Sequence, residues 1–176
     1  KLEPWVSTWL LTSGVNTLRP ELNIVDGKYQ TIKILQEAPR IPTGSKELRP
    51  HRMAIALYDL SGDRLILRKS VELDVAGSST PVDALKGEKA ADLLLLNDRD
   101  LTYAKIRFDQ RSIETLKQNL GKLEDKLTRV LCWSATWDML RDAELSASDF
   151  IEITKAGLQG EDDVTTVSTL GAQIGG

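Results

Sequence analysis

The stretch His51-Arg52-Met53-Ala54-Ile55-Ala56-Leu57-Tyr58-Asp59-Leu60, followed by Ser61-Gly62-Asp63, indicates a β-strand that enters a tight turn. Met53, Ile55 and Leu57 occupy alternate positions, so we expect their side chains to point to one buried face. Glycine and aspartate favour hairpin turns, and a second apolar alternation follows over residues 64–75. The pattern therefore predicts a β-hairpin within a β-rich first half.

Strand patterns continue on both sides of this hairpin. Asp26-Gly27 closes an earlier hairpin, because both residues tolerate positive φ. Three prolines within residues 38–50 predict a long exposed loop. The apolar run 91–96 is typical of a central strand covered on both faces. We expect seven or so strands, over residues 21–25, 29–37, 51–60, 64–75, 80–85 (an edge strand with Pro81), 91–96 and 104–108. Such a series is typical of an immunoglobulin-like β-sandwich.

The second half has helical periodicity. Asp109 is expected to cap a helix that stops at Gly121, and residues 124–144 form the strongest helix, apolar on more than one side. Ser146 and Asp149 have the spacing of a capping box, and a stop is expected at 157–160. A further helix is expected to begin at Glu161-Asp162-Asp163 and to carry Val164, Val167 and Leu170. The fold class is thus mainly β plus α, a β-sandwich followed by an antiparallel helical segment.

Composition excludes some functions. The chain has 176 residues and a net charge of −3, so no basic surface for nucleic acid is expected. No apolar run approaches the roughly 20 residues that cross a bilayer, so no membrane partner is expected either. The single cysteine, Cys132, permits no internal disulfide, which favours a cytoplasmic location.

Candidate catalytic residues are few. His51 is the single histidine, and a surface or interface position beside Arg49 and Arg52 is favoured over a metal ligand. Cys132 is interpreted as a small buried side chain. Asp98 with Asp100, and the acidic run 161–163, could serve acid–base chemistry, but such residues are common at turns and helix starts. The sequence predicts no catalytic residue and no metal ligand.

The four tryptophans form two pairs. Trp5 and Trp9 are four residues apart, as are Trp133 and Trp137, so each pair shares a helix face. An aromatic ligand platform is one interpretation. Packing between domains is the favoured one, because both pairs fall at expected domain edges.

Several stretches resemble one protein family. The opening segment reads as a helix end, a glycine stop and an extended exit. Similar stretches follow in the family's order. They are Trp9-Leu10-Leu11-Thr12-Ser13-Gly14-Val15-Asn16-Thr17-Leu18, Leu35-Gln36-Glu37-Ala38-Pro39, Leu48-Arg49-Pro50-His51-Arg52, Leu96-Asn97-Asp98-Arg99-Asp100-Leu101-Thr102-Tyr103-Ala104-Lys105, and Cys132-Trp133-Ser134-Ala135-Thr136-Trp137-Asp138-Met139. They resemble the aminopeptidase N family of zinc metallopeptidases, of the gluzincin type and in its actinobacterial branch.

The resemblance implies a fragment of a larger enzyme. Residues 1–18 would end the catalytic domain, 19–109 form the sandwich, and 110–176 begin the helical domain. The upstream catalytic domain and downstream helical repeats would be partners, with zinc and peptide substrates belonging to the parent. Neither H-E-x-x-H nor Gly-Ala-Met-Glu-Asn occurs here, so no zinc ligand or catalytic residue is carried over.

Two alternatives stay open at this point. One is a free-standing sandwich module that binds a protein partner. The other is a small enzyme that uses Asp98 or Asp100. If the chain is a fragment, residues up to about Thr12 are expected to fray or to pack against a neighbouring molecule.

Overall fold

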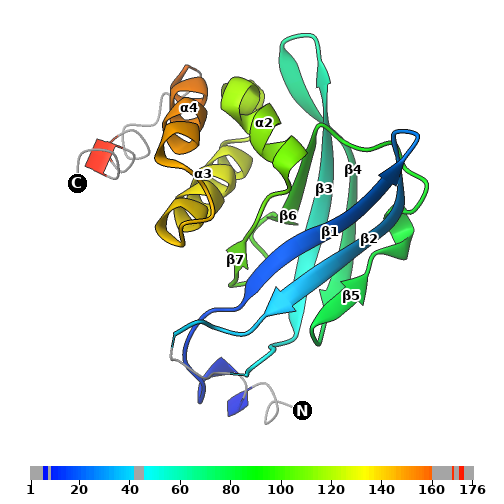
Figure 1. Cartoon of the computed structure of the whole chain (residues 1–176), viewed down its shortest axis with the longest axis vertical. Coiled ribbons are helices and arrows are strands. Elements are labelled where there is room, and N and C mark those ends of the chain that lie inside the picture. Colours follow the sequence, from blue (N-terminus) through cyan, green and yellow to red (C-terminus); the bar gives the residue numbers. More distant parts are fainter. Residues whose placement is uncertain (1–5, 8, 42–45, 160–167, 169–170, 173–176) are drawn as a thin grey trace.

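A computed structural model describes residues 6–7, 9–41, 46–159, 168 and 171–172. In this part of the chain, β-strands form two sheets, and α-helices follow them (Figure 1). The first sheet has the order β5-β2-β1-β7 and the second β4-β3-β6. The strands are β1 (Thr17–Val25), β2 (Lys28–Glu37), β3 (His51–Ser61), β4 (Arg64–Val75), β5 (Ser79–Pro81), β6 (Leu93–Asp98) and β7 (Lys105–Ile106), and the helices are α2 (Gln110–Asn119), α3 (Lys126–Arg141) and α4 (Ala147–Leu158).

The first sheet is built on the predicted hairpin at Asp26-Gly27. Asp26 has φ 50° and Gly27 has φ 71°, and β1 pairs with β2 in antiparallel register. The strand β1 starts at Thr17, four residues before the predicted start. Ile32 and Ile34 are buried and alternate with the exposed Thr31 and Lys33, as expected of a strand with one face on the core. The short strand β5 lies at the sheet edge, where Pro81 needs no ladder donor.

The second sheet contains the hairpin that was predicted around the turn Ser61-Gly62-Asp63. The strands β3 and β4 pair along their length, and Gly62 in the turn has φ 62°. Met53, Ile55 and Leu57 are buried, as predicted, but β3 does not simply alternate, because Ala54, Ala56 and Tyr58 are buried as well. This strand lies between β4 and β6, and its second face is covered in part by α3, where Tyr58 Oη lies 3.4 Å from Thr128 Oγ1.

The strand β6 is buried on both faces, as predicted, but it is not a central strand. It pairs with β3 and ends the described sheet. Two side chains of α2 lie along the edge of β6 that has no neighbouring strand. Ser112 Oγ accepts a hydrogen bond from the Leu94 amide at 3.0 Å, and Thr115 Oγ1 donates to the Asp92 carbonyl at 2.6 Å. The helix thereby supplies the hydrogen bonds that a neighbouring strand would otherwise make.

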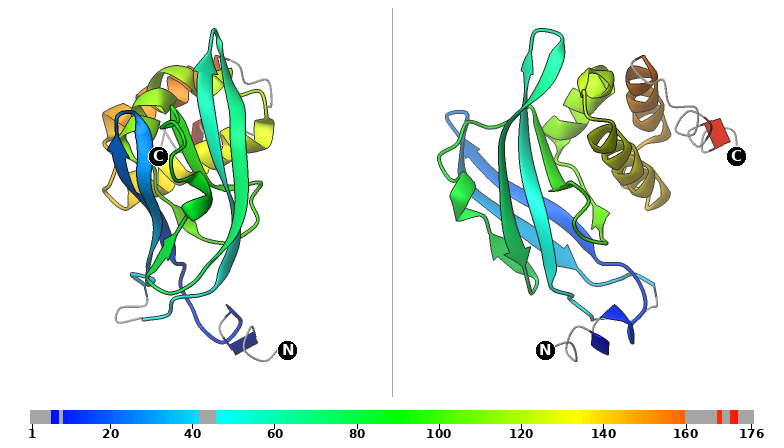
Figure 2. Two further views of the ribbon diagram at one scale, coloured as in Figure 1. Left: turned by 90° about the vertical axis from the view of Figure 1, so that its right-hand side faces the viewer. Right: turned by 180° about the vertical axis from the view of Figure 1, so that it is seen from behind.

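The two sheets form facing layers, and the helices lie beside the strands β6 and β7 (Figures 1 and 2). One apolar core joins both sheets and the helices, and it includes Leu18, Ile34, Ile55, Leu57, Leu95, Leu116 and Ile153. The predicted last strand, 104–108, is reduced to β7, which pairs with β1 in parallel.

All three predicted helix starts are confirmed. Asp109, Asp125 and Ser146 each accept a hydrogen bond from a backbone amide in the first turn of α2, α3 and α4 respectively. The predicted stops of α2 and α4 are also confirmed. The helix α2 ends at Asn119 with Leu120 as its C-cap, so Gly121 directly follows the cap, in the 3-10 turn η2 (Leu120–Lys122). The helix α4 ends at Leu158, within the expected 157–160. Gly157 lies inside α4, where a Cβ atom would come within 2.9 Å of Leu120 Cδ2 and of Trp133 Cε2, so this glycine permits close packing.

The loop after β2 is only partly exposed. Pro39 and Arg49 are buried, which corrects the prediction of an exposed loop over 38–50. Leu127 and Val130 on α3 are 44% and 41% exposed, so this second apolar side of α3 lacks full cover in the described structure. The predicted helix with Glu161-Asp162-Asp163, Val164, Val167 and Leu170 lies outside the described residues.

Candidate functional site

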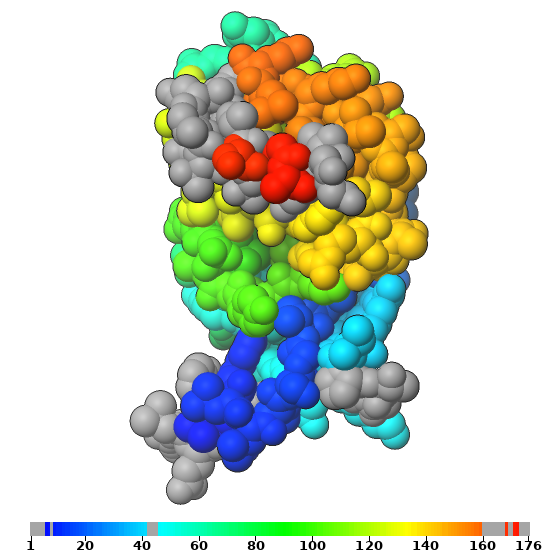
Figure 3. All heavy atoms as spheres, turned by 90° about the vertical axis from the view of Figure 1, so that its left-hand side faces the viewer, coloured from blue at the N-terminus to red at the C-terminus, as the bar shows by residue number. Residues whose placement is uncertain are grey.

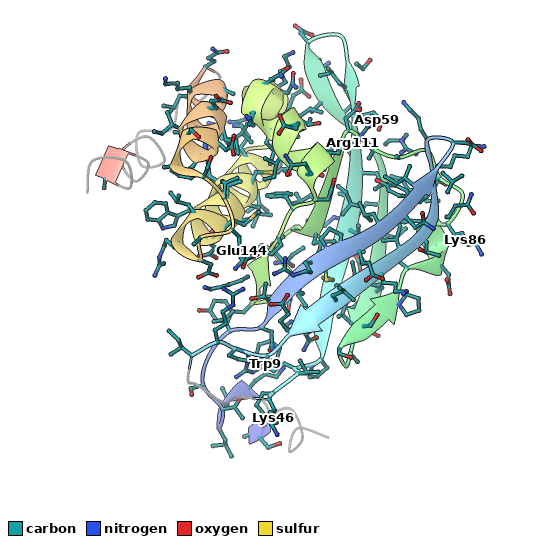
Figure 4. All side chains as sticks on the ribbon, in the orientation of Figure 1. Trp9, Lys46, Asp59, Lys86, Arg111 and Glu144 are labelled. Atoms are coloured by element: carbon teal, nitrogen blue, oxygen red, sulfur yellow. The ribbon has the colours of Figure 1, made fainter. Side chains whose placement is uncertain are left out.

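A cluster of charged side chains joins the first sheet to the connection between α3 and α4. Arg107 follows β7 and its side chain is 1% exposed. Its Nη2 pairs with Asp142 Oδ2, and its Nε lies 3.2 Å from Glu144 Oε2. Figure 4 shows Glu144 at the place where the helices meet the sheets. The strand ends and the helical connection are therefore held together by ion pairs around one buried guanidinium.

Further cations surround the same two carboxylates. Lys105 Nζ lies 2.7 Å from Asp142 Oδ2, and Arg19 Nη2 on β1 lies 3.0 Å from Glu144 Oε2. Burial by itself would raise the pKa of Asp142, but hydrogen bonds from Lys105 and Arg107 outweigh it and lower that pKa. Both carboxylates are therefore ionised at neutral pH. A general acid or base needs a pKa near the working pH, so this cluster suits structural coupling rather than proton transfer.

Trp9, labelled in Figure 4 near the same end of the sheets as Glu144, forms a second junction with His51. The two rings meet edge to face, with centroids 5.3 Å apart, and the Arg49 guanidinium carbon lies 5.6 Å from the Trp9 ring centre. A pocket of about 520 Å³ opens beside them, lined in part by Leu101 and Tyr103. The position of Trp9 agrees with the interpretation as a packing residue, and its partner in another domain stays a prediction.

His51 is not a surface histidine, since it is 3% exposed. Its Nδ1 lies 2.7 Å from Thr102 Oγ1. Burial, with the positive charge of Arg49, lowers the pKa of His51 to about 4, so the ring is neutral at pH 7. The ring thus packs between Thr102, in the loop after β6, and the Trp9 ring.

Trp133 and Trp137 lie in the packing between α3 and α4. Trp133 is 3% exposed, and the Trp137 ring centroid lies 5.5 Å from that of Phe150 on α4. Figure 3 shows the face formed by α3 and α4, coloured yellow to orange, above the blue N-terminal residues. Both rings therefore have partners inside this chain, and packing against another domain stays a prediction. Trp5 lies outside the described residues.

The other candidate residues are not brought together. Cys132 is fully buried, and burial raises the pKa of its thiol, which agrees with a structural role. Asp98 is not a turn residue, because it lies in β6, is 4% exposed and accepts a hydrogen bond from Tyr58 Oη at 2.9 Å. Asp100 lies in the turn and faces Asn97. The two carboxyl groups therefore do not form an acid–base pair.

The described residues do not fit a zinc site. They contain no group of three or more histidine, cysteine, aspartate and glutamate side chains placed to hold a metal ion. The whole sequence has one histidine, so the two imidazoles of H-E-x-x-H cannot be supplied. Within the same described ranges, no helix has the length and hydropathy needed to cross a membrane.

Comparisons with known proteins agree with this arrangement. Residues 93–176 match the family model of the ERAP1-like C-terminal domain. The matched range begins at β6 and includes all of the helices. The chain is also 44% identical over 178 residues to Aminopeptidase N of Streptomyces lividans. By these two comparisons, the chain is homologous to the C-terminal region of aminopeptidase N. The alignment covers 98% of this chain and 21% of that relative, so the chain spans about one fifth of the relative's length.

Proposed function

We propose that the chain is the non-catalytic connecting segment of a zinc-dependent aminopeptidase. The observation that carries this proposal is the 44% identity over 98% of the chain to only 21% of an aminopeptidase N. In this proposal residues 1–18 end the catalytic domain, 19–109 form an immunoglobulin-like β-sandwich, and 110–176 begin the helical domain. The two facing sheets and the following helices support this division.

The proposed role is mechanical. The catalytic domain before this segment would hold zinc and remove amino-terminal residues from peptides by metal-assisted hydrolysis. The helical domain after it would close over that site. The buried Arg107 supports such a role, because its ion pairs join the first sheet to the α3–α4 connection, and loss of either carboxylate would leave a buried charge without a partner. The proposed location is the cytoplasm.

The test begins with the gene on either side of this chain. We expect H-E-x-x-H to be encoded upstream of Lys1. A longer protein that includes it should hydrolyse aminoacyl arylamides, lose this activity with a chelator and regain it with zinc. The present chain, with zinc added, should show no turnover. Glutamine in place of the motif's glutamate provides the control for the longer protein.

Two outcomes would contradict the proposal. One is chelator-sensitive turnover by the present chain alone. The other is a gene in which no peptidase motif adjoins this segment, which would favour the free-standing interaction module.

A further inference from the structure

Arg49 lies buried at the end of the loop between β2 and β3, with 3% of its surface exposed. Its guanidinium is directed at the segment that precedes β1. Nη1 donates to Asn16 Oδ1 at 3.0 Å, and Nη2 donates to Thr12 Oγ1 at 2.6 Å and to the Ser13 carbonyl at 3.2 Å. The planar group therefore binds three successive parts of one short segment, which a lysine could not do in the same geometry.

The same segment is held from its other side. Asn16 Nδ2 donates to the carbonyls of Glu37 and Glu47, at 3.1 Å and 2.6 Å. Gly14 has φ +86°, and a Cβ atom there would lie 2.5 Å from Pro39 Cβ. Residues 12–16 are thus confined between Arg49 and the chain that leaves β2. Gln36 Nε2 in turn donates to the Arg49 carbonyl at 2.9 Å, so β2 holds the arginine backbone in place.

Trp9 extends this anchorage by one helical turn. Its ring lies against Arg49 and His51, whereas Leu10 and Leu11 are 65% and 77% exposed. Tyr103, in the adjacent pocket, is 72% exposed. The segment around residue 9 therefore has one side chain, Trp9, packed against the sheets, and two exposed apolar side chains, Leu10 and Leu11.

We infer that Arg49 is a positioning residue that locks residues 9–16 onto the two sheets as one rigid body. The polypeptide before this segment is then held at a single angle to the two sheets. Any hinge between the preceding domain and the helices must lie outside residues 9–16. The identity of the preceding domain rests on the proposed function, but the rigid anchorage itself is a property of this chain.

The test measures the anchorage in the full chain. Spin labels are placed at Leu10→Cys and at the exposed Gln30→Cys on β2, while the fully buried Cys132 stays unlabelled. Pulsed electron resonance should give one narrow distance distribution. Arg49→Met should broaden it, and in the unlabelled variant the amides of residues 9–16 should exchange hydrogen roughly tenfold faster.

Arg52→Met is the matched control. Arg52 is three residues away and 56% exposed, and it pairs with Glu72 and Asp74 on β4 rather than with the anchored segment. It should leave both readouts unchanged. If Arg49→Met does not fold, judged by β2 amide exchange, then Thr12→Val provides the milder variant and should broaden the distribution less.

A broad distribution in the unsubstituted chain would overturn the inference, as would a narrow one in folded Arg49→Met or Thr12→Val. Neither result depends on peptidase activity. Failure of the anchorage can therefore be told apart from failure of the proposed function, which the longer protein tests.

Discussion

Replacing Arg107 by methionine should destabilise the chain more than replacing any exposed arginine. Methionine keeps an unbranched apolar stem but removes the guanidinium that lies against Asp142 and Glu144. Removing one partner of a fully buried ion pair costs roughly 3–5 kcal/mol. Here the side chains of Asp142 and Glu144 are 17% and 20% exposed and keep other cations, so we expect the lower figure of about 2–3 kcal/mol.

The assay is equilibrium unfolding in urea, followed by circular dichroism. The midpoint should fall while the slope with denaturant stays constant, because the surface exposed on unfolding is nearly unchanged. Arg52→Met again serves as the control, since its exposed ion pairs contribute little to stability.

The effect should depend on pH in one direction. The pKa values of Asp142 and Glu144 are lowered in the folded chain, because hydrogen bonds and charges from the cations outweigh burial. In the unfolded chain these groups titrate near about pH 4. The stabilisation is therefore present above that pH and is lost as the pH falls through the lower folded values. A difference below about 1 kcal/mol at pH 7, or one that persists unchanged at pH 3, would refute the reasoning.

Three further predictions follow from single buried sites. Gly157→Ala should lower the midpoint of thermal unfolding, because the added Cβ would overlap Leu120 and Trp133. We expect a net cost of about 1–2 kcal/mol even after the better helix propensity of alanine is counted. An unchanged or higher midpoint would contradict this. The His51 ring should titrate near pH 4 when followed by NMR. Because this pKa lies below the unfolded value, the stability of the chain should decrease as the pH falls from about 6.5 to about 4. Titration near pH 6.5 would show that the ring is not buried as described. Cys132 should react with a thiol reagent only as fast as the chain unfolds, so a rapid reaction under native conditions would contradict its burial.

Local patterns predicted the local structure well. The two hairpins, the N-caps Asp109 and Ser146 and the start of the helix predicted from residue 124 depend on residues within a few positions of one another, and all are confirmed. The strand β6 shows the limit of such local prediction. Its apolar run correctly indicated that both faces are covered. The run does not show whether β6 is a central strand or an edge strand whose amides bond to helix side chains, as the Leu94 amide does to Ser112.

The charged clusters could not be predicted for a related reason. In the predicted strand 104–108, Arg107 alternates with the apolar Ile106 and Phe108, so the local pattern alone would place it on the outer face. Its partners Asp142 and Glu144 lie 35 and 37 residues further on, and no local spacing connects them. Arg49 was noted only as a neighbour of His51, although its partners Thr12 and Asn16 precede it by more than 30 residues. The close packing of Gly157 against Trp133 was not predicted, because it leaves no mark in the sequence around the glycine.

The same contacts explain why the opening segment carries so much of the family resemblance. Thr12 and Asn16 supply the acceptors for Arg49, Ser13 adds its carbonyl, and Gly14 supplies a left-handed backbone where a Cβ would strike Pro39. The residue types of Thr12, Gly14 and Asn16 are therefore each used in this contact, whereas Ser13 contributes only its backbone. The other half of the contact is Glu37-Ala38-Pro39 and Leu48-Arg49-Pro50, two further stretches of the resemblance. Three separate sequence segments therefore describe one joint, and a change in any one of them should require a change in the others.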